Sequence, residues 1–172
     1  ASLDHQLAFV LEEQTRLKQM ENTIIGLKNA LSIEGQIDEA LLQQMIQLSN
    51  RENEKKIVMR NQFFAEDELN LIQTLPNLNS NDPHSLEWIA LLGQLKQLMP
   101  DGPNSESVQK IIKRMMEKSN EAYSNNDEFL EKVWEVRKSP SLSDQMGLYP
   151  LDEELLSFIE QAYAIYEENL SK

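Results

Sequence analysis

Two histidines and several adjacent acidic pairs are the side chains of this sequence that could exchange protons or bind a metal. His5 lies in a long helical pattern, and His84 follows Pro83 at a helix start. Neither belongs to an HExxH motif or to a set of two cysteines and two histidines, and no GxSxG elbow or glycine-rich phosphate loop is present. Adjacent pairs such as Glu12–Glu13 and Glu153–Glu154 diverge on a helix and are typical of solvated surface. The sequence therefore predicts no enzyme, no metal site and no cofactor.

Aromatic and methionine side chains gather in the last two thirds of the chain and could form an apolar binding cleft. Such side chains make adaptable walls for bulky, flat ligands. The predicted ligand-binding residues are Phe63, Phe64, Trp88, Met115, Tyr123, Trp134, Tyr149 and Tyr163. Trp and Tyr are favoured over Phe158 because their polar atoms prefer the edge of a cleft. The competing interpretation is that these side chains form the core of a helical bundle.

Charge and composition narrow the classes of partner. The 172 residues carry a formal net charge of −13 and include no cysteine. So acidic a chain repels a phosphate backbone and should not hold DNA or RNA by itself, whereas cationic ligands are mildly favoured. The lack of cysteine excludes disulfides and thiolate metal sites and agrees with a cytoplasmic location. No apolar run approaches the roughly 18 residues of a membrane span, and the start lacks a signal-peptide pattern.

Helical periodicity dominates the chain, and no strand pattern of useful length is present. Helices are predicted over residues 3–31, 37–50, 57–75, 84–99, 107–123, 127–139 and 151–170. The third of these is predicted to consist of two short helices that meet near Ala65. The pattern predicts an all-α fold, in which a long N-terminal helix precedes a compact bundle of about six or seven shorter helices.

Local signals predict where several helices begin and end. Gly35 is a candidate left-handed cap after the long helix. Asp82 followed by Pro83 supplies a capping side chain and a proline at the first helical position, which together predict a helix start. Asn104 or Ser105 can cap the helix that begins near residue 107.

Other connecting segments carry weaker signals. Asn125 with Glu128 resembles a capping box ahead of the helix over 127–139. The charged run 51–56 is predicted to be either a turn or a solvated helical bridge. Residues 140–150 are predicted to form an irregular connection.

The long first helix carries an apolar residue at every seventh position. These residues are Leu3, Val10, Leu17, Ile24 and Leu31. A helix of 29 residues is roughly 43 Å long, which is longer than a small bundle is wide. A seven-residue apolar repeat on such a helix favours pairing with a second copy, so these five residues are the predicted dimer interface. The alternative is that the helix packs along its own domain.

A family resemblance follows from the order of the segments. The long helix HQLAFVLEEQTRLKQMENTIIGLKNAL, placed just before a helical domain, resembles the dimerisation helix of MerR-type bacterial transcription regulators. FFAEDELNLI, LEWIALLGQLKQLM and DGPNSESVQKIIKRMMEKSNEAY resemble the TipAS-type ligand-binding domain, as do FLEKVWEVRKS and GLYPLDEELLSFIEQAYAIY. The order matches over essentially the whole chain. The cysteine through which some members trap a ligand covalently is absent.

The resemblance implies a domain organisation and a function. Residues 1–34 would form the dimerisation helix, 35–60 a helical connector or lid, and 61–172 the effector-binding domain. The chain would be the regulatory half of a homodimeric regulator that binds a small hydrophobic ligand. The negative charge of the chain favours a ligand that is also cationic. It would act on DNA only through a winged helix-turn-helix domain absent from this sequence. The alternative function is a helical protein-interaction or dimerisation module without a small ligand.

Overall fold

The computed structural model describes residues 2–50 and 53–172, and of residues 48–50 and 53 it describes only the backbone. Within these ranges there is no strand, so the predicted all-α fold with a long first helix is confirmed. The helices are α1 Ser2–Glu34, α2 Glu39–Asn50, α3 Asn53–Phe63, α4 Glu66–Ile72, α5 Pro83–Leu98, the short 3-10 helix η1 Met99–Asp101, α6 Glu106–Tyr123, α7 Asp127–Lys138, α8 Pro140–Gln145 and α9 Glu153–Leu170. None of the described helices is long and apolar enough to cross a membrane.

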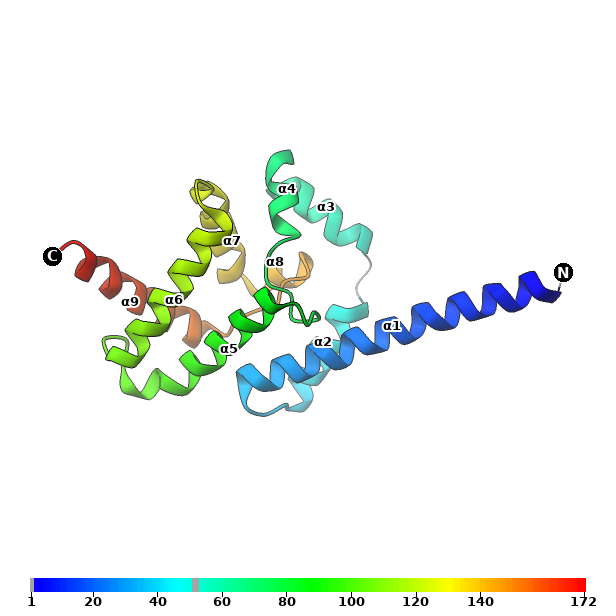
Figure 1. The fold of residues 1–172 in the computed structure, drawn as a ribbon, viewed down its shortest axis with the longest axis horizontal. Helices are drawn as coiled ribbons and strands as arrows, with labels where there is room; N and C mark the ends of the chain where they lie inside the picture. Colours follow the sequence, from blue (N-terminus) through cyan, green and yellow to red (C-terminus); the bar gives the residue numbers. More distant parts are fainter. Residues whose placement is uncertain (1, 51–52) are drawn as a thin grey trace.

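Helix α1 projects from the rest of the molecule, and its C-terminal part lies against α2 and α5 (Figure 1). Its buried residues are Gly26, Asn29, Ala30 and Ile33, which lie on one face at spacings of three and four. The helix therefore packs against the bundle only over its last third.

The crossing of α1 and α5 depends on a glycine. A Cβ atom built on Gly93 of α5 would lie 2.6 Å from the backbone oxygen of Ser32. That distance is too short for any other residue, so Gly93 allows the two helix backbones to approach closely. The loop before α5 reaches α1 in a similar way, because a Cβ on Gly26 would overlap the side chain of Asn79.

Two hydrophobic clusters hold the bundle together. The first, which we call the α9 core, contains Leu91, Leu95, Val108, Ile111, Ile112, Met115, Leu151, Leu155, Leu156, Phe158, Ile159 and Ala162. The second, which we call the α7 core, contains Phe64, Ile72, Leu75, Tyr123, Phe129, Val133, Val136, Met146 and Leu148. Helix α6 connects them, since it contributes residues to both.

Most of the predicted helix ends are confirmed. Gly35 has a φ of 76° and ends α1. Asp82 is the N-cap of α5 and accepts a hydrogen bond of 2.8 Å from the amide of Ser85. Ser105 caps α6 by accepting from Val108. The predicted break near Ala65 is also present, between α3 and α4.

Two local predictions are wrong, and one segment lies outside the described residues. Asn125 does not begin a capping box; it adopts a positive φ of 65°, and Asn126 takes the N-cap position of α7 without a side-chain hydrogen bond. Residues 140–145 are helical rather than irregular, because Ser139 accepts from the amide of Leu142 and Pro140 supplies the first helical residue. Residues 51–52 of the charged run are not described.

Candidate functional site

The apolar stripe on α1 is the most exposed hydrophobic feature of the described chain. The exposed fractions are 78% for Leu3, 48% for Val10, 52% for Leu17, 56% for Ile24 and 46% for Leu31. Ile24 and Leu31 stay exposed although α1 packs on the bundle near them, because the bundle covers the opposite face. An apolar stripe of this length in water marks an interaction surface. The dimer interface itself remains a prediction.

The eight predicted ligand-binding residues lie in two hydrophobic clusters. Phe64 and Tyr123 are buried in the α7 core, and the exposed ring of Phe63 lies 5.4 Å from that of Phe64. Met115 is buried in the α9 core, and four others pack against it while partly exposed: Trp88, Trp134, Tyr149 and Tyr163. The structure therefore brings these residues together in two separate groups, and their role in ligand binding stays a prediction.

Four of these aromatic residues have hydrogen-bond partners for their polar atoms: Tyr123, Trp134, Tyr149 and Tyr163. The hydroxyl of Tyr123 donates to the carbonyl of Thr74 at 2.9 Å. Trp134 Nε1 donates to Glu160 at 3.1 Å, and Tyr163 donates to Glu167 at 2.6 Å. The latter hydrogen bond raises the pKa of Tyr163 to about 12. The polar atoms of these side chains therefore make hydrogen bonds within the protein and are not free for a ligand in this structure.

Tyr149 connects the bundle to the end of α1. Its hydroxyl donates to Glu34 at 2.9 Å, while the other oxygen of Glu34 pairs with Lys96, which also binds Asp152 at 2.8 Å. Burial, followed by the nearby charge of Glu34, raises the pKa of Tyr149 well above its usual range. This network joins α1, α5 and the start of α9. A movement of α9 would therefore displace the side chains that hold the end of α1.

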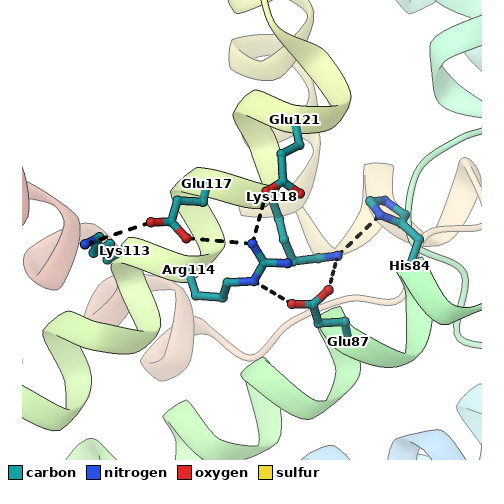
Figure 2. Close-up of polar contacts among 7 residues, drawn as sticks. All are labelled: His84, Glu87, Lys113, Arg114, Glu117, Lys118 and Glu121. Carbon is teal, nitrogen blue, oxygen red and sulfur yellow. Dashed lines mark hydrogen bonds and ion pairs between the residues drawn. The ribbon is translucent and has the colours of Figure 1, made fainter.

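A charged network joins α5 to α6 (Figure 2). Lys118 donates to Glu87 at 2.8 Å and lies 3.4 Å from Nδ1 of His84. Arg114 donates to the other oxygen of Glu87 at 2.6 Å and also pairs with Glu121 at 3.2 Å. Lys118 is only 4% exposed, so its ammonium depends on Glu87 for compensation of its charge.

Helix α5 also carries two buried donors without acceptors. Because an ammonium group only donates, Nδ1 of His84 must accept from Lys118, and the ring proton lies on Nε2. That Nε2 and the Nε1 of Trp88 are buried and have no partner among the described residues. A buried donor that stays unpaired costs about 1–3 kcal/mol, so both groups need a partner such as an ordered water.

Acid should weaken the network in Figure 2 within a defined range. Hydrogen bonds from Arg114, then from Lys118, lower the pKa of Glu87 to about 2 from 4.5. A lowered carboxyl pKa stabilises the folded state above pH 4.5, and this contribution is lost as the pH falls toward 2. We expect the melting temperature of the parent to fall more steeply over this range than that of Glu87→Gln.

The control for the acid prediction is Glu131→Gln, which removes an exposed carboxylate that has no partner among the described residues. This variant should keep the pH dependence of the parent. If the melting temperatures of all three proteins fell in parallel below pH 4.5, Glu87 would not be held in the network in solution.

Two of the hollows among the described residues were not indicated by the sequence. The larger, of about 850 Å³, lies along α9 beside the end of α5 and is lined by Lys96, Met99, Pro100, Glu153, Glu154, Ser157, Phe158 and Gln161. The smaller, of about 460 Å³, lies at the start of α5 and is lined by Leu71, Gln73, Thr74, Leu75, Asn77, Ser80, Asp82, His84, Ser85 and Ala122. None of the eight predicted ligand-binding residues lines either hollow.

The described residues contain no group of three His, Cys, Asp or Glu side chains that could hold a metal ion. His84 belongs to the α5–α6 network, and His5 lies on the exposed part of α1. Comparisons with protein-family models, with characterised proteins and with solved structures give no match. The geometry of the chain must therefore carry any functional conclusion.

Proposed function

We propose that this chain is the regulatory, dimerising half of a MerR-type transcription regulator. The observation that carries the proposal is the projecting α1, whose apolar stripe remains exposed beside a helical bundle. Pairing of α1 with α1 of a second copy would bury this stripe on both chains. The acidic net charge fits a part of the regulator that does not itself contact DNA.

The contacts between α1 and the bundle could transmit a conformational change in the bundle to α1. Gly93 places α5 directly against α1, and Glu34 joins α1 to Lys96 and Tyr149. A rearrangement of the bundle would therefore change the position of α1. A ligand can drive such a change only if it binds the two arrangements with different affinity.

A small hydrophobic molecule is the proposed effector. Its proposed contacts are the five predicted residues that belong to the α9 core or pack against it, Trp88, Met115, Trp134, Tyr149 and Tyr163, and all five are buried or half-buried. The ligand would therefore enter by separating packed side chains, so its binding energy would be coupled to a change in packing. A shift of this kind in the α9 core would reach Tyr149, which packs against that core.

One observation favours the alternative, a helical protein-interaction module. The predicted ligand-binding residues are divided between two cores, and several of their polar atoms already have partners. In this case α1 would be a structural dimerisation element, and the aromatic side chains would only stabilise the bundle.

Tryptophan fluorescence distinguishes the two functions. Trp88 and Trp134 both pack against the α9 core, so a ligand that enters this core should change their emission. The chain should be titrated with a broad panel of lipophilic and cationic dyes and antibiotics. Saturable changes at micromolar concentration would support the sensor, whereas a flat response across the panel would favour the interaction module.

A further inference from the structure

Methionine supplies all the sulfur of this chain, because the sequence contains seven methionines and no cysteine. Met20 is 48% exposed, which sets it apart from the others. Three methionines are buried and three are half-buried against the bundle: Met45, Met115 and Met146, and Met59, Met99 and Met116. An oxidant dissolved in water therefore meets one well-exposed sulfur atom, that of Met20.

Met20 lies within the exposed apolar surface of α1. It follows Leu17 by three residues and precedes Ile24 by four, so the three side chains lie on one face of the helix. All three are about half exposed in the single chain. A change in the polarity of Met20 would therefore alter the middle of the surface through which α1 is proposed to pair.

A guanidinium group lies beside the sulfur atom. Arg16, one turn earlier, donates from Nη1 to Sδ of Met20 at 3.3 Å and also forms an ion pair with Glu13. A thioether sulfur is only a weak acceptor, whereas the oxygen of a sulfoxide accepts strongly from a charged donor. The single chain therefore offers both water and Arg16 to an oxidised Met20, and these contacts stabilise the oxidised form.

We propose that Met20 is a site of reversible oxidation through which a peroxide controls the pairing of α1. The sulfur attacks one oxygen of hydrogen peroxide and the O–O bond breaks. The hydroxide that leaves takes the proton of the transferred oxygen and becomes water. Met20 becomes a sulfoxide, and the peroxide gains the two electrons that the sulfur loses; methionine sulfoxide reductases reverse the change. The oxidation does not depend on the proposed function, but its effect on pairing rests on it.

Oxidation and pairing compete for the same face of α1. Pairing of two α1 helices would remove Met20 from water, so a peroxide would reach the sulfur atom chiefly in the single chain. Once the sulfoxide has formed, pairing would remove water from its oxygen, and the cost of burying an acceptor in this way opposes association. A peroxide would therefore hold single chains as monomers, and the effect would be greatest at low concentration of the chain.

Peptide mass mapping during treatment with hydrogen peroxide tests the site. In a dilute solution of the chain, Met20 should be oxidised at least about fivefold faster than any of the three half-buried methionines, because its sulfur is the most accessible to the oxidant. Equal rates for Met20 and the half-buried methionines would overturn the site.

Light scattering over a dilution series tests the effect on pairing. Oxidation of Met20 should weaken association at least about tenfold, because each dimer would bury two sulfoxides. Met20→Leu should associate like the parent and keep its association in peroxide, whereas Met20→Gln, which is polar and of similar length, should associate weakly without peroxide. The control Met116→Leu removes a half-buried methionine and should respond to peroxide like the parent. Loss of association in peroxide-treated Met20→Leu would assign the effect to another methionine and overturn the inference.

The dependence of the oxidation rate on chain concentration separates this inference from the proposed function. If α1 pairs, oxidation of Met20 should slow as the concentration rises, while oxidation of Met116 keeps its rate. A chain that stays monomeric while Met20 is oxidised first would contradict the dimeric regulator, and with it the control of pairing, and would leave Met20 as the oxidation site. A dimer whose association is unchanged after complete oxidation of Met20 would overturn the control of pairing and leave the regulator in place.

Discussion

Leu17→Glu combined with Ile24→Glu is expected to convert a dimer of this chain into a folded monomer. Both side chains are about half exposed in the single chain and lie at the centre of the apolar stripe on α1. Burying such a side chain is worth about 1.5–3 kcal/mol, and a symmetric pair of helices contains each position twice. The double change should therefore weaken association at least a hundredfold, while the bundle keeps its helical content.

Light scattering of the parent and the variant gives the masses directly. The control is Thr15→Glu with Gln19→Glu, which adds the same charge on the face of α1 turned away from the stripe. The control should keep the mass of the parent. A variant whose mass matches that of a dimeric parent would show that the stripe does not hold the two chains together.

Gly93→Ala is expected to destabilise the chain by about 2 kcal/mol and lower its melting temperature by roughly 4–8 °C. In an open helix the same change would gain about 1 kcal/mol of helix propensity. Here the new Cβ would lie 2.6 Å from the backbone oxygen of Ser32, so α1 and α5 must move apart. A backbone atom cannot rotate out of the way as a side chain can.

Gly26→Ala is the graded comparison for this prediction. Its Cβ would meet the side-chain oxygen of Asn79, which can rotate, so the loss of stability should be smaller than for Gly93→Ala. Thermal unfolding of both variants shows which of them loses more stability relative to the parent. A Gly93→Ala chain more stable than the parent would mean that α1 does not cross α5 so closely in solution.

The sequence predicted the parts of the fold that depend on nearby residues. Asp82 and Pro83 fix the start of α5 through a carboxylate, an amide three residues later and a ring with a fixed φ, all within one turn. Asn125 shows the limit of this reasoning. An asparagine can cap a helix or adopt a positive φ, and only the path of the chain between α6 and α7 decides between them.

The site could not be predicted because its parts are distant in the sequence. Asn29 contacts carbonyls about fifty residues away, and Tyr149 reaches Glu34 across more than a hundred residues. Composition placed the aromatic residues in one cleft, yet Phe64 and Trp88 belong to different clusters. Amino-acid type predicts that such side chains are buried together with others, but not which neighbours they have.

The N-terminal two thirds of α1 do not pack against the bundle, so their helical content depends on what else they contact. This part gains no stability from packing on the bundle, its first turn is costly to form, and surface pairs such as Glu13–Arg16 and Lys18–Glu21 add little to helix stability. If α1 pairs with α1 of a second copy, then association of the two chains and helix formation in this segment are coupled. Dilution would melt this segment and open Arg16 and Lys18 to trypsin, so the abundance of the chain would itself govern its lifetime.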